Sequence, residues 1–174
     1  DAPQTISFVA GKGRTLPSHK LKRKNRNEPS PLKAAIVYGA NASGKSNLVK
    51  CFNLAKKMVV KGFHIDEQIN RTPFRLRPNA IKEPSWFEFE LDLNGELYAY
   101  KLVFDDRIIL EESLTQIRAT TERSLFSRTY VDQKTSVKFD DNFSSKEEQQ
   151  RFQFIAQNTR PNQPFLTETV ESNS

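Results

Sequence analysis

Residues 37–48, VYGANASGKSNL, constrain this chain more than any other stretch of its sequence. Within them, residues 39–46 (GANASGKS) fit the pattern G-x-x-x-x-G-K-S/T. The apolar run KAAIVY (33–38) precedes the pattern and predicts a buried parallel strand. Apolar residues then recur at helical spacing from Leu48, which predicts an amphipathic helix that ends at Gly62. Strand, glycine-rich loop and helix in this order indicate a phosphate-binding P-loop.

Each residue type in this loop has a chemical reason. Gly39 permits a tight turn, and Gly44 leaves room for a phosphate to approach the backbone. Backbone N–H groups at the helix N-terminus form an anion-binding nest, where the helix dipole favours negative charge. Lys45 supplies a charge for the β- and γ-phosphates and is the catalytic candidate, while the hydroxyl of Ser46 is the candidate Mg²⁺ ligand. We therefore expect ATP and Mg²⁺ to be held by Gly39, Ala40, Asn41, Ala42, Ser43, Gly44, Lys45, Ser46 and Asn47.

The composition excludes some classes of protein. The 174 residues suit one domain or one lobe of a larger one, and no stretch approaches the ~20 apolar residues of a membrane span. We therefore expect no membrane partner, and because Cys51 is the only cysteine, we expect no internal disulfide and a cytoplasmic location. The net charge of +6 is concentrated in a basic run that is typical of a solvated loop, with nucleic-acid contact as the alternative: Lys20, Lys22, Arg23, Lys24 and Arg26.

The second half of the chain predicts an antiparallel sheet. Residues 86–93 alternate apolar and acidic side chains, and Asn94-Gly95 is a strong hairpin signal before the return strand 96–104. Further strands are predicted over 107–118, 124–131 and 136–139, a short strand over 5–10, and a helix behind the capping box SKEE at 145–148. The fold class is therefore α/β, divided into a P-loop core at 1–82 with a basic loop at 11–32, an antiparallel meander at 83–140, and a helix and tail at 141–174.

Asn41 and Ala42 narrow the class further. A loop reading G-x-N-x-S-G-K-S resembles ABC-type ATPases of the SMC and OLD-like group, and its form here looks most like bacterial ABC-type AAA-family ATP-binding proteins. Many of these belong to anti-phage defence systems, including retron-associated and Septu-type ATPases. Residues 71–76 (RTPFRL) and 83–114 resemble the stretch that follows the P-loop in that family.

This resemblance implies a P-loop NTPase lobe of ABC-ATPase type with an antiparallel β subdomain. It places Asn41 near the β- and γ-phosphates, and it implies a homodimer and an effector partner such as a nuclease or toxin. An LSGG-like signature, a Walker B acid pair and a switch histidine are expected as well, but we find none of the three in this sequence. We therefore expect an N-terminal portion of a larger ATPase that is inactive alone.

Several residues resemble the missing parts. KLVFDD (101–106) looks like a Walker B strand, but a solvated hairpin turn is the better interpretation of Asp105 and Asp106. Gln68 is a candidate for the glutamine that reaches Mg²⁺ and the attacking water, although its spacing from the P-loop is short. His64 lies too early for a switch histidine and is expected on the surface. The alternatives to an ABC-type ATPase are a small P-loop kinase and a nucleic-acid-binding or scaffold module with a vestigial P-loop.

Overall fold

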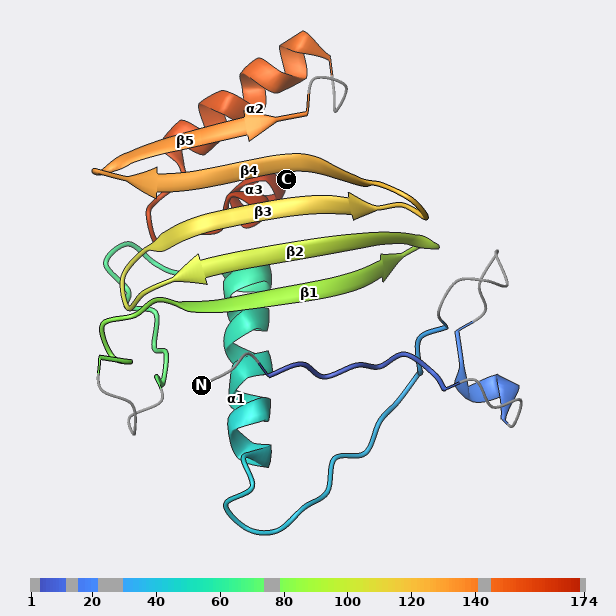
Figure 1. The fold of residues 1–174 in the computed structure, drawn as a ribbon. Coiled ribbons are helices and arrows are strands. Elements are labelled where there is room, and N and C mark those ends of the chain that lie inside the picture. Colours follow the sequence, from blue (N-terminus) through green and yellow to red (C-terminus); the bar gives the residue numbers. More distant parts are fainter. Residues whose placement is uncertain (1–3, 12–15, 22–29, 74–78, 141–144, 173–174) are drawn as a thin grey trace. The chain divides into compact units, whose positions relative to one another are not determined.

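The computed structural model divides the chain into two compact units, Asp1–Val49 and Lys50–Ser174 (Figure 1). The three domains predicted from the sequence, at 1–82, 83–140 and 141–174, stay predictions. The residues that the structure describes are 4–11, 16–21, 30–73, 79–140 and 145–172.

The first unit holds little regular structure ahead of the glycine-rich loop. A 3₁₀ turn, η1 (Pro17–His19), is followed by isolated antiparallel bridges that pair Val9 with Pro31 and Lys20 with Leu32. The strand predicted over 5–10 is therefore wrong beyond one bridge, because a strand needs a continuous ladder of backbone hydrogen bonds to a neighbour, and the described residues pair with this segment only at Val9.

The strand predicted over 33–38 is also wrong in this structure. No strand forms there, and Ile36 and Tyr38 are 91% and 90% exposed. An apolar run of this kind is typical of a strand that is covered on both faces. A strand exists only through hydrogen bonds to a neighbouring strand, and the described part of the chain provides none for these residues.

The second unit is built on a five-stranded antiparallel sheet in the order β1-β2-β3-β4-β5, which confirms the predicted meander. Both two-residue hairpins have left-handed central residues, with φ of 57° and 90° at Asn94 and Gly95 and of 49° and 60° at Asp132 and Gln133. Such turns match the twist of the flanking strands. The strands are β1 (Ser85–Leu93), β2 (Glu96–Phe104), β3 (Ile109–Ile117), β4 (Glu122–Val131) and β5 (Lys134–Phe139).

The part of the chain that the structure describes also forms helices (Figure 1). The predicted amphipathic helix forms as α1 (Lys45–Lys56), and it continues as a single π-helical turn, η2 (Lys57–Lys61), up to Gly62. The predicted capping box is present, because Ser145 and Glu148 exchange side-chain and backbone hydrogen bonds at the start of α2 (Lys146–Asn158). Helix α3 (Phe165–Glu171) follows.

One face of the sheet carries the core. On β2 the alternating side chains of Tyr100, Leu102 and Phe104 are at most 2% exposed. They join one apolar cluster with side chains from η2, the loop that follows it, β3, β4, α2 and α3, including Met58, Phe63, Ile69, Ile109, Phe126, Ile155 and Phe165. Because α1 contributes only its last turns, Ala55 is buried whereas Phe52 is 43% exposed.

A buried ion pair lies within this apolar face. The side chains of Glu112 on β3 and Arg128 on β4 are 0% and 1% exposed and meet at 3.3 Å. Glu112 also accepts hydrogen bonds from the Tyr100 hydroxyl at 2.8 Å and from the backbone N–H groups of Phe165 and Leu166 at 2.6 and 2.9 Å. Burial, and then the charge of Glu112, raise the pKa of Tyr100 well above its ordinary value, so its hydroxyl remains a donor. The carboxylate therefore fastens the start of α3 to the sheet.

A second contact joins η2 to the segment before α3. Gly62 has φ 65°, and a Cβ placed on it would lie 2.1 Å from Oε1 of the buried Gln163. That same oxygen accepts a hydrogen bond from the backbone N–H of Phe63 at 2.9 Å. The end of the helix is thus held by a side chain about 100 residues later in the sequence, and only glycine fits there.

We predict that Gly62→Ala destabilises the second unit by about 2–4 kcal/mol, because it combines a left-handed φ with overpacking against Gln163. Urea unfolding followed by circular dichroism measures this change. Gly11→Ala is the control, since a Cβ at Gly11 meets no atom within 4 Å, and it should leave stability nearly unchanged. Equal midpoints for the two variants would contradict the steric argument.

We predict that Glu112→Gln lowers the free energy of unfolding by about 3–5 kcal/mol, because it leaves the charge of Arg128 buried without a counter-charge. The neighbouring Glu111 is exposed and lies 3.8 Å from Lys101 in a surface pair. Glu111→Gln should therefore cost at most about 1 kcal/mol. Denaturant unfolding of both variants decides the point, and a loss at residue 112 no larger than at 111 would refute it.

Candidate nucleotide site

The glycine-rich loop has the backbone of a phosphate cradle. Ala42 and Gly44 adopt left-handed φ of 62° and 92° ahead of α1. Gly39 is close to Ser43, because a Cβ on Gly39 would lie 3.0 Å from the Ser43 Oγ. Leu48 donates the first intrahelical hydrogen bond of this turn to Gly44, at 3.0 Å. Both glycines of the pattern therefore stand at positions where a side chain would crowd or strain the loop.

Lys45 is turned back over this loop. Its Nζ donates hydrogen bonds to the backbone oxygens of Gly39 and Ala40, both at 2.6 Å, and to the Ser43 Oγ at 3.2 Å. The ammonium group is thus held at the centre of the segment 39–43. A cation in that position raises the local positive potential where the helix dipole already does so.

The residues present fit a phosphate group. The first N–H groups of an α-helix have no intrahelical acceptors, and here they belong to Lys45, Ser46 and Asn47 at the start of a twelve-residue helix. The hydroxyl of Ser46 and the amide of Asn47 lie in the same turn. This set provides backbone donors, one cation and one hydroxyl, which are the groups that a P-loop offers to a nucleotide with its Mg²⁺.

Both carboxylates of the β2–β3 turn have hydrogen-bond partners, Asp105 within the turn and Asp106 at Arg71. Asp105 accepts hydrogen bonds from the backbone N–H groups of Arg107 and Ile108 at 2.7 and 2.9 Å. Asp106 accepts from the Arg71 Nε at 2.8 Å, and the Arg71 side chain is only 3% exposed. These contacts agree with the solvated-turn interpretation rather than a Walker B role. Across the described residues, no three His, Cys, Asp or Glu side chains form a group that could hold a metal ion.

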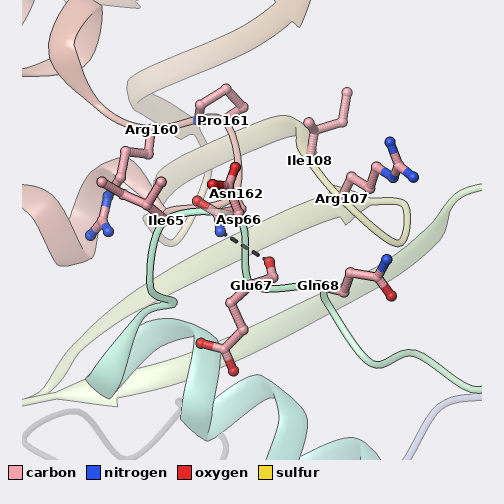
Figure 2. A pocket seen from close by; sticks show the side chains of 9 residues that line it. All are labelled: Ile65, Asp66, Glu67, Gln68, Arg107, Ile108, Arg160, Pro161 and Asn162. Carbon is pink, nitrogen blue, oxygen red and sulfur yellow. Dashed lines mark hydrogen bonds between the residues drawn. The ribbon is translucent and has the colours of Figure 1, made fainter.

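The other sequence candidates are Gln68 and His64, which lie in the second unit, and the basic run, which lies in the first. Gln68 is exposed and lies beside the β2–β3 turn (Figure 2). Its role toward Mg²⁺ stays a prediction. His64 is exposed just after η2, as expected for a surface residue. In the basic run, Lys20 donates to the Gly11 oxygen at 3.4 Å. Lys22, Arg23, Lys24 and Arg26 lie outside the described residues, so nucleic-acid contact stays a prediction.

Arg71 is a structural residue that sequence reasoning missed. Besides Asp106, its guanidinium donates to the backbone oxygens of Ile81 at 2.6 Å and Glu83 at 2.7 Å. It therefore fixes the segment that leads into β1. The one signal for Arg71 in the sequence was its place in RTPFRL, after the helix and before the first strand. Its role could not be predicted from there, because its partners are 10 to 35 residues away.

Loop and helix together define a P-loop NTPase of the α/β class. Residues 34–166 match the family model described as "AAA domain, putative AbiEii toxin, Type IV TA system", and the chain belongs to this family of AAA domains. Membership implies an ATP-binding protein of ATPase type, and AAA domains bind ATP with Mg²⁺. No curated protein and no solved structure gave a match to the chain. Among the described helices, none has the length and apolar character required to cross a membrane.

An acid-sensitive contact lies just beyond the helix that follows the loop. The Lys57 ammonium, and then the backbone N–H of His64, hydrogen-bond to Glu67 and lower the pKa of its carboxyl below the ordinary value of 4.5. A carboxyl whose pKa is lower in the folded protein than in the unfolded chain stabilises the fold at pH values above the unfolded pKa. This stabilisation is lost as the pH falls through the folded pKa.

We therefore predict that the wild-type protein loses this contribution below about pH 4.5, and that Glu67→Gln loses it at every pH. Urea midpoints measured from pH 7 down to pH 3 should converge for the two proteins at the acid end. Glu90→Gln is the control, because it removes an exposed carboxyl of β1 that has the same charge but no contact with Lys57. It distinguishes the loss of the Lys57 contact from the loss of one negative charge. Wild-type and Glu67→Gln curves that stay parallel throughout would refute the assignment.

Proposed function

We propose that residues 39–47 hold the triphosphate of ATP with Mg²⁺, with Lys45 at the β- and γ-phosphates, Ser46 as the protein ligand of the metal ion, and Asn41 beside the terminal phosphates. The observation that carries this proposal is the position of the Lys45 Nζ, 2.6 Å from the backbone oxygens of both Gly39 and Ala40. A lysine whose ammonium group faces a glycine-rich loop at a helix N-terminus is suited to bind phosphate. It contributes little to the core, because its charged end points into the loop.

We further propose that the chain belongs to an ABC-type ATPase related to the SMC and OLD-like group, working as a homodimer in the cytoplasm. Phosphoryl transfer needs charge stabilisation from several sides and a positioned water. The P-loop supplies one of those sides, while Asp105 is hydrogen-bonded within its turn and Asp106 to Arg71. A complementary signature and an acid pair must then come from elsewhere in the assembly. Hydrolysis would belong to the complete dimer.

ATP binding and hydrolysis would then gate a partner effector in anti-phage defence, of the kind found in retron-associated or Septu-type systems. Two features support this proposal. The loop GANASGKSNL is of the form found in such ATPases. The matching family model names a toxin of a toxin–antitoxin system in its description. A nuclease or toxin is the partner class that we propose.

We predict that Lys45→Ala weakens Mg-ATP binding about 10- to 100-fold, because a charge-assisted contact to phosphate contributes roughly 1.5–3 kcal/mol. Calorimetric titration of both proteins gives the two dissociation constants. The thermal midpoint should change little, because the side chain contacts only the exposed loop.

Lys50→Ala is the matched control for this titration. It removes the same charge from the same helix at an exposed position and should leave the affinity for Mg-ATP nearly unchanged. Equal weakening by the two substitutions would show a general charge effect instead of a P-loop contact. If the wild-type chain does not bind Mg-ATP at all, the site is vestigial.

A further inference from the structure

A cavity of about 420 Å³ lies in the second unit (Figure 2). Three segments that are distant in sequence form it: the loop after η2, the β2–β3 turn, and the segment that follows α2. Its volume lies within the range of about 300–1,000 Å³ that is usual for ligand sites. The lining residues are Ile65, Asp66, Glu67, Gln68, Arg107, Ile108, Arg160, Pro161 and Asn162.

Hydrogen bonds hold the three segments together around this cavity. The buried Asn162 donates from Nδ2 to the backbone oxygens of His64 at 2.8 Å and Glu67 at 3.1 Å. The backbone N–H of Ile109, at the end of the β2–β3 turn, donates to the Pro161 oxygen at 2.8 Å. Because backbone atoms of all three segments are fixed in this way, the cavity is preformed, which reduces the entropic cost of binding.

The lining has an apolar middle and cationic ends. Figure 2 shows Arg160 and Arg107 at opposite ends of the cavity, with Ile65, Pro161 and Ile108 between them. Ile65 is 71% exposed, so a large aliphatic side chain stands open to solvent beside the cavity. A ligand that covers this middle part gains hydrophobic contact only if it is apolar there as well.

The charges around the cavity favour an anionic ligand. Within the described part of the chain, neither arginine guanidinium takes part in a hydrogen bond or ion pair. The carboxylate of Glu67 is engaged by Lys57 and by the His64 backbone N–H. That leaves Asp66 as the single acid on the lining without such a partner, against two arginines. Guanidinium groups bind carboxylates through paired hydrogen bonds.

We propose that this cavity binds a short acidic peptide segment of another protein, in which apolar side chains are flanked on both sides by carboxylates. The apolar part would cover Ile65, Pro161 and Ile108, and the carboxylates would reach Arg107 and Arg160. A nucleotide fits less well, because its anionic groups lie at one end only. A peptide backbone also carries N–H donors for Asp66, which a simple dicarboxylate lacks.

This peptide site is independent of the proposed nucleotide site. All nine lining residues lie within Lys50–Ser174, whereas the P-loop belongs to Asp1–Val49. Lys45→Ala should therefore leave peptide affinity unchanged. Failure of either proposal can be recognised without reference to the other.

Chemical-shift titration of the ¹⁵N-labelled full chain with a blocked peptide, Gly-Glu-Leu-Leu-Glu-Gly, tests the proposal. We expect a dissociation constant below about 1 mM and amide shifts concentrated at residues 65–68, 107–108, 160 and 162. The counterpart with both Glu replaced by Gln should bind about tenfold more weakly, and added salt should reduce the difference between the two peptides.

The double variant Arg107→Gln/Arg160→Gln should lose about tenfold or more in affinity for the acidic peptide. Its matched control, Lys134→Gln/Lys138→Gln, removes two charges from exposed positions on β5 and should change affinity less than about twofold. Equal losses in the two variants would overturn the proposal. So would an acidic peptide that does not bind, or pyrophosphate shifting the same residues while the peptide does not.

Discussion

The second unit depends on a charge pair that is removed from water. Glu112 and Arg128 lie on adjacent strands inside an apolar face, and taking both from solvent is costly unless every polar atom of the carboxylate finds a partner. Glu112 meets that requirement with a hydroxyl, a guanidinium and two backbone N–H groups of α3. The pair therefore specifies where the C-terminal segment docks, which hydrophobic contact alone would leave less well defined.

That docking arranges the rest of the unit. Arg128 also donates to the backbone oxygen of Gln163 at 2.9 Å, and Gln163 in turn holds the end of η2 through Phe63. Thr167 on α3 donates to the Val59 oxygen at 2.9 Å within the π-helical turn. Within the second unit, one connected set of hydrogen bonds thus runs from the sheet through the segment before α3 to η2. The peptide cavity borders the same segment at residues 160–162.

The two proposed sites differ in what builds them. The nucleotide site is local, since its loop and helix start are consecutive residues and the cation that serves it bonds to its own loop. The peptide cavity is assembled from three segments and exists only because long-range contacts such as that of Asn162 close them together. A mutation that loosens α3 is therefore expected to alter the cavity before it alters the P-loop.

The sequence by itself determined the features that depend on near neighbours. The P-loop pattern, the amphipathic helix, the Asn94-Gly95 hairpin, the meander and the capping box at Ser145 all follow from turn chemistry and periodicity over a few residues. Only the tertiary structure decided the rest. The partnership of Glu112 with Arg128, the fit of Gly62 against Gln163 and the role of Arg71 join residues distant in the chain, where periodicity carries no information. The strand expected over 33–38 failed for the same reason, because a strand is completed by its neighbours and not by its own composition.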